Sequence, residues 1–72
     1  MRTQQAPKIA TRTHYSIYLW GQMDRAASTH RSLRAAERRA ELLAKQGREN
    51  TLYWIGPQGE KSEIRDYLRE VA

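Results

Sequence analysis

Cysteine is absent from this sequence, and so are long apolar runs. Without cysteine the chain has no disulfides and no zinc site with thiolate ligands. The two histidines, His14 and His30, have no third ligand at a recognisable spacing, so we expect neither a metal nor a cofactor. No segment approaches the roughly 20 apolar residues of a membrane span, and residues 1–13 lack the apolar core of a signal peptide. These absences lead us to expect a soluble, cytoplasmic protein.

Sequence patterns typical of catalytic sites are equally scarce. Neither histidine has an acidic neighbour that would orient it, and no serine lies in a nucleophile-elbow motif. No glycine-rich phosphate-binding loop is present. A chain of 72 residues buries only about 60% of the surface that its unfolded form exposes, which leaves little room for a catalytic cleft. We therefore expect a non-enzymatic domain that a partner, or self-association as a homodimer, would help to stabilise.

The net charge of +5 is unevenly distributed along the chain. Residues 1–13 hold three basic and no acidic side chains, and residues 14–50 hold seven basic and four acidic ones. Residues 51–72 hold three basic and four acidic side chains. Positive potential therefore belongs to the first 50 residues, which favours a partner with an acidic surface, either a protein, a protein–nucleic-acid complex, or DNA or RNA itself.

The sequence divides into a terminal arm and one domain. Residues 1–13 are polar and basic, and we expect a flexible arm with a short edge strand at residues 8–11. Residues 14–72 form the single domain. Within it, alternating apolar and polar residues predict a strand at residues 14–20, followed by a turn and a short returning strand at residues 25–30.

The clearest element is a helix between Ser32 and Gly47. Ser32 is a good N-cap, because its hydroxyl can accept a hydrogen bond from a free amide of the first turn. Gly47 is suited to the left-handed conformation that ends many helices. At 100° per residue one face collects the apolar residues that we expect to pack on a sheet. These are Leu33, Ala36, Ala40, Leu43 and Ala44.

The second half of the domain begins with a predicted strand at residues 51–55 and a turn at residues 56–59. The next segment is ambiguous. The spacing of Ile64, Tyr67, Leu68 and Val71 is helical, yet residues 61–65 suit the second arm of a hairpin. We expect a hairpin arm to about Arg65 and then a short helical turn.

These elements predict an α+β fold, with an antiparallel sheet of three to four strands and one helix packed on one face. Bulky side chains of the sheet must fill the space opposite the small alanines. We expect the following to point inward: Ile17, Leu19, Leu52 and Trp54. The alternation then directs a second set to the uncovered face: Tyr18, Trp20, Tyr53 and Ile55. A shift of one residue would reverse this assignment for the second strand, so the face that carries Trp54 stays open.

The arrangement resembles a bacterial family of small uncharacterised domains with a strand–strand–helix–hairpin order. The matching segments lie between residues 14 and 67: Ser28-Thr29, Ala36-Glu37, Ala40, Leu43-Ala44-Lys45, Gly47, Leu52-Tyr53-Trp54 and Gln58-Gly59. Gln58 stands where that family often has an aspartate. The resemblance implies a fold and no activity. The layout is also similar to small phage inhibitors of the anti-CRISPR type, which would place the protein in a host cytoplasm.

The candidate binding residues begin with a basic stripe on the helix. Arg31, Arg34, Arg38 and Lys45 fall within an arc of roughly 60°, and Arg39 lies nearby. The stripe can contact phosphates, with help from the basic arm, or an acidic protein surface. A solvated face, partly neutralised by Glu37 and Glu41, is the alternative.

Two further features are candidates for recognition. The outer aromatics Tyr18, Trp20 and Tyr53 can stack on unpaired bases, form a protein interface, or lie beneath a lid of Tyr67 and Leu68. Leu42 lies among arginines, either as an apolar anchor of an interface or as an ordinary exposed leucine. We expect an adaptor or inhibitor directed at a protein; the alternative is a nucleic-acid-binding protein without sequence specificity.

Overall fold

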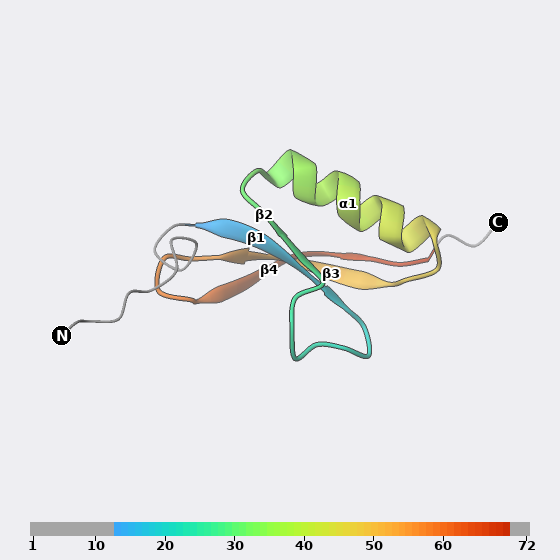
Figure 1. Cartoon of the computed structure of the whole chain (residues 1–72), viewed down its shortest axis with the longest axis horizontal. Coiled ribbons are helices and arrows are strands. Elements are labelled where there is room, and N and C mark those ends of the chain that lie inside the picture. The colour runs from blue at the N-terminus through green and yellow to red at the C-terminus, as the bar shows by residue number, and fades with distance from the viewer. Residues whose placement is uncertain (1–12, 70–72) are drawn as a thin grey trace.

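The computed structural model describes residues 13–69, which form a four-stranded antiparallel sheet with one helix on one face (Figure 1). In chain order the elements are β1 His14–Leu19, β2 Ser28–His30, α1 Leu33–Lys45, β3 Asn50–Ile55 and β4 Lys61–Tyr67. The predicted α+β fold is therefore confirmed. The expected edge strand at residues 8–11 lies outside the described residues.

The strands are arranged in the order β2-β1-β3-β4, so β1 and β3 are central. In the register Ile17 is opposite Leu52, and Tyr15 is opposite Trp54. Directly opposed residues share a face, and both pairs lie on the side that α1 covers, because Ile17, Leu52 and Tyr15 pack in or against its core. The inward orientation predicted for Trp54 is confirmed, although its side chain is only half-buried.

Both ends of α1 follow the chemistry predicted from the sequence. The Ser32 hydroxyl accepts a hydrogen bond from the Ala35 amide at 3.0 Å. At the other end Gly47 adopts a φ of +83°, and its amide donates to the Ala44 carbonyl. The next amide, of Arg48, donates to the Leu43 carbonyl at 2.8 Å. This pair of bonds is a Schellman motif, which requires a left-handed residue and so favours glycine.

The core lies between α1 and the two central strands. Ala36, Ala40, Leu43 and Ala44 are the buried residues of the helix. The side chain of Asn50, fully buried on β3, also joins the two layers, since its Nδ2 donates to the Ala40 carbonyl at 3.1 Å. A second bond runs from Nδ2 to the Arg48 carbonyl. The Asn50 amide therefore holds the middle of the helix against the start of β3.

One residue of the predicted apolar stripe is misplaced. Leu33 is 38% exposed rather than part of the core. It is the first residue of α1, immediately after the N-cap. At that position the helix has only begun to cross the sheet, so fewer side chains of the sheet lie opposite Leu33 to cover it.

The C-terminal segment also departs from the prediction. The strand β4 continues to Tyr67, so the helical turn expected after Arg65 does not form at Asp66 or Tyr67, and residues 68 and 69 are not helical either. Asp66 and Tyr67 instead pair with Thr51 and Asn50. Residues 70–72, which contain the last position of the helical pattern, lie outside the described part of the chain.

Two local features explain why β4 is a strand. The turn before it holds a Gly59 amide to Gly56 carbonyl bond of 3.0 Å, with Gly59 at a φ of +86°, as hairpin turns of this kind require. Further along, the pairing with β3 shifts by one residue between Leu52 and Tyr53, which leaves Ile64 as the extra residue of a β-bulge. The bulge interrupts the period of two that would have identified the strand in the sequence.

Replacement of Ala40 by leucine tests how tightly α1 packs. Ala40 is fully buried, and we expect Ala40→Leu to lower the free energy of unfolding by about 1–3 kcal/mol, because the added methylenes have no space. Ala35→Leu, on the exposed side of the same helix, is the matched control and should change it by less than about 0.5 kcal/mol. Urea denaturation measures both, and equal effects would contradict close packing at Ala40.

Candidate binding site

The side of α1 that faces solvent carries most of its positive charge. We define the basic helix face by five exposed residues: Arg34, Arg38, Arg39, Leu42 and Lys45. The buried alanines lie on the opposite side of the helix, so these side chains point away from the sheet. Arg31 is also exposed but precedes the N-cap, so it is not part of the helical stripe in which the sequence placed it.

Leu42 occupies the middle of the basic helix face. It is 44% exposed, and its neighbours on the helical surface, three and four residues away, are Arg38, Arg39 and Lys45. A single leucine surrounded by cations costs little when it is exposed to water. It is well suited, however, to an apolar hollow with an acidic rim on a partner protein. The structure thus keeps Leu42 out of the core.

The acidic residues of α1 lie on the flank that faces β4. Glu37 and Glu41 both act on the hydroxyl of Tyr67, a residue of β4 whose side chain is 6% exposed. Burial raises the pKa of Tyr67 above its ordinary value of 10.0. The positive charge of Arg65 opposes this shift, whereas Glu37 and Glu41 add to it. The two carboxylates are therefore close enough to β4 to act on the Tyr67 phenol.

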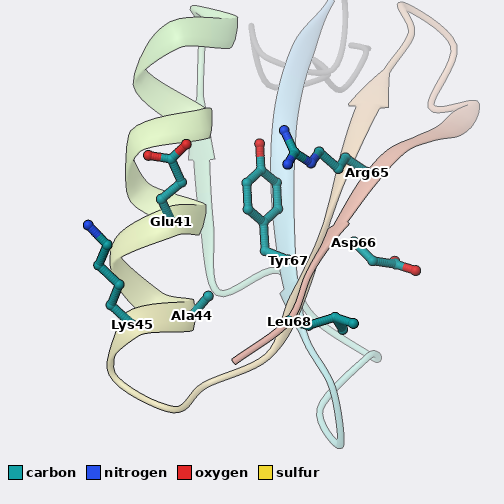
Figure 2. Close-up of a pocket in the computed structure, with 7 residues that line it drawn as sticks. All are labelled: Glu41, Ala44, Lys45, Arg65, Asp66, Tyr67 and Leu68. Carbon is teal, nitrogen blue, oxygen red and sulfur yellow. The ribbon is translucent and has the colours of Figure 1, made fainter. Parts of the chain in front are cut away.

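A groove with a volume of about 360 Å³ runs between this flank and β4. Figure 2 shows the Tyr67 ring between the two elements, with Glu41 on the helix wall and Arg65 on the strand wall. The Arg65 guanidinium lies 5.0 Å from the centre of the Tyr67 ring. Ala44, Lys45, Asp66 and Leu68 complete the lining, and Figure 2 shows the Asp66 side chain directed away from the helix.

The outer face of the sheet brings together two of the predicted aromatics. The rings of Tyr18 and Tyr53 meet edge to face at 5.4 Å, with an angle of 86° between their planes. The Lys61 ammonium lies 4.3 Å from the centre of the Tyr18 ring and 5.3 Å from that of Tyr53. A base that stacks on the same ring face would have to displace this lysine. Base stacking is therefore less favoured here than the pattern of aromatic residues alone indicates.

The third aromatic is fixed by hydrogen bonds. Trp20 is exposed, but its Nε1 donates to the Thr51 hydroxyl at 2.9 Å, and that hydroxyl donates to Asp66 at 2.7 Å. This chain crosses from β3 to β4 on the face away from the helix, so the predicted lid is wrong for Tyr67, which lies on the helix face. Ile55 is directed outward by the register but is buried.

A metal-binding cluster and a membrane-spanning helix are both absent from the described residues. Within residues 13–69, no group of three His, Asp or Glu side chains is placed to hold a metal ion. The helix α1 is neither long nor apolar enough to cross a membrane, and no other described segment is helical. What remains in this part of the chain is a set of surfaces, and the basic helix face and the groove beside it share Lys45.

No family model, curated protein or solved structure matches the chain. The observed order β1–β2–α1–β3–β4 is the order that the resemblance to small bacterial domains implies. Membership of that family stays a prediction, as does the similarity to phage inhibitors.

Sequence reasoning missed the groove and the residue at its centre. Tyr67 was assigned to a helical turn or a lid, because its spacing from Ile64 and Leu68 is helical. The usable signal was the alternation from Arg65 to Tyr67 toward the end of a hairpin arm. Asn50 was missed as well, since nothing in its sequence context distinguishes a buried asparagine from one in a loop.

The raised pKa of Tyr67 predicts a loss of stability in alkali. A phenol whose pKa is higher in the folded than in the unfolded state stabilises the fold fully below about pH 10, and this contribution is lost as the pH rises through the folded value. We expect Tyr67→Phe to reduce the fall in unfolding free energy between about pH 9 and about pH 11 in urea denaturation. An undiminished fall in the variant would contradict the prediction.

Proposed function

We propose that this protein is a non-enzymatic binding module that docks the basic helix face onto an acidic protein surface. The observation that carries the proposal is the position of Leu42, exposed at the centre of Arg38, Arg39 and Lys45. Protein interfaces commonly combine an apolar anchor with a charged rim that excludes water and sets the orientation. Arginine is also enriched in such interfaces, because its guanidinium pairs with carboxylates in a fixed geometry.

Three features favour a protein over a nucleic acid as the partner. Leu42 contributes nothing to phosphate binding, yet it is central to the basic helix face. Lys61 covers the outer tyrosine pair that a single strand would need for stacking. The outer sheet also carries Glu63 and Asp66, on the face of Tyr53 and Thr51, which repel phosphates. A nucleic acid is therefore the alternative partner, and oligonucleotide binding tests it.

Replacement of Leu42 by aspartate is the test of the apolar anchor. We expect Leu42→Asp to weaken capture of a protein partner by about 30-fold at near-physiological salt, the effect of losing a central interface residue. Met23→Asp is the matched control, because Met23 is 43% exposed but lies in the loop between β1 and β2. Immobilised wild-type protein and both variants are exposed to a cell lysate, and the retained proteins are quantified.

The same three proteins are titrated against labelled single- and double-stranded oligonucleotides by fluorescence anisotropy at low and near-physiological salt. We expect weak binding that disappears at the higher salt and is insensitive to Leu42→Asp, because it reflects counterion release alone. Binding that persists at near-physiological salt and is lost in Arg38→Glu but not in Leu42→Asp would overturn the proposal in favour of a nucleic acid.

A further inference from the structure

The two edges of the sheet differ in length. The edge strand β2 has three residues, whereas β4 has seven and pairs with β3 on one side only. Alternate backbone N–H and C=O groups of an edge strand point away from the sheet, where they can pair with another extended segment. The long edge of β4 is thus the stronger template for strand addition in the described part of the chain.

The bulge at Ile64 divides this edge into two parts. The first part, residues 61–63, carries Lys61 and Glu63 and ends at the irregular pairing. The second part, residues 65–67, pairs regularly with β3 and lies along α1. Both parts carry two charged side chains, so what distinguishes them is the irregular pairing, which protects an edge from indiscriminate pairing where it occurs. Residues 65–67 remain as a short, regular stretch of edge.

The groove lies beside that stretch. An added strand on residues 65–67 would project alternate side chains toward the helix flank, into the space between Glu41, Lys45 and Tyr67. The volume of about 360 Å³ falls at the lower end of the range for ligand sites, which suits a few side chains and not a large molecule. Figure 2 shows the Tyr67 ring between α1 and β4, with the Lys45 and Glu41 side chains on the helix and that of Arg65 on the strand.

The charges of the groove indicate the occupant. Arg65 and Lys45 line it from opposite elements, together with the carboxylate of Glu41 on the helix. Asp66 also belongs to the lining, but its carboxylate is directed to the outer face and accepts from Thr51. We propose that residues 65–67 of β4 accept an extended acidic peptide segment as a fifth strand, with its side chains in this groove. The proposal rests on the proposed function, since the segment would belong to the acidic protein partner that the adjoining basic helix face contacts.

A second copy of this chain is a poorer occupant of the same edge. A symmetric antiparallel pairing of residues 65–67 with themselves places the Asp66 carboxylates of the two copies directly opposite each other. Like charges in directly opposed positions destabilise a sheet. An acidic peptide from another protein avoids this repulsion, because it can place a neutral side chain opposite Asp66 and an acidic one toward Arg65.

The test uses a defined probe, a fluorescein-labelled octapeptide of alternating valine and aspartate, titrated into the full chain by anisotropy. We expect saturable binding that Lys45→Glu weakens by about tenfold. Arg25→Glu, the same charge reversal at an exposed position between β1 and β2, is the matched control and should change the affinity by less than about twofold. A peptide with proline at two central positions should bind about tenfold more weakly, because it lacks the amide donors of a strand.

Amide hydrogen exchange supplies a readout that does not depend on any variant. The peptide should protect amides within residues 65–68, whereas protection confined to α1 would place it on the basic helix face and overturn the proposal. Absence of binding up to about 1 mM peptide, or equal binding of the proline peptide, would also overturn it. Leu42→Asp separates the two proposals: it should weaken capture of the partner by about 30-fold but change the affinity for the octapeptide by much less than Lys45→Glu does, by about twofold at most. Concentration-dependent dimerisation that protects the same amides would assign the edge to a second copy.

Discussion

Alanines at positions 36, 40 and 44 bring α1 close to β1 and β3, and the Asn50 side chain fixes it there by a hydrogen bond to the Ala40 carbonyl. Four strands about 4.8 Å apart span about 14 Å between the axes of the outer strands. A helix is about 10–12 Å wide with its side chains, and one whose inner side chains are alanines covers less. The single helix therefore leaves part of β4 uncovered on the helix side, and within the described residues no second helix covers the opposite face of the sheet.

The distribution of charge follows from the same placement. One flank of α1 faces β4, and there Glu37 and Glu41 add to the raised pKa that burial gives the Tyr67 phenol. The side of the helix away from the sheet has no neighbouring element within the described residues, and it carries Arg38 and Leu42, both exposed to solvent. One helix thus has a core side, an acidic flank and a basic pole, and only the core side is needed for folding.

The sequence predicted the parts of the fold that local chemistry determines. The Ser32 cap, the Gly47 terminus and the inward face of the central strands are set by residues a few positions apart, and the structure confirms them. The core position predicted for Leu33 and the helical turn predicted for Tyr67 were wrong, because both depend on more than the local sequence. Exposure at Leu33 depends on where the helix first meets the sheet, and the strand at Tyr67 follows a bulge that breaks the alternation. The groove depends on the lateral position of α1 over the sheet, which no periodicity encodes.

The bulge at Ile64 has two structural effects on β4. It breaks the regular ladder of a long edge strand, which limits how far any added strand can extend and so reduces the risk of aggregation. It also reverses the alternation along β4, so that Arg65 and Tyr67 share the helix side while Glu63 lies on the outer side. If residues 63–67 alternated regularly, with Ile64 paired instead of bulged, Glu63 would lie on the same side as Arg65 and Tyr67. The bulge therefore keeps the Glu63 carboxylate off the helix side of β4, which connects the irregularity of this strand to the acidic segment proposed for its edge.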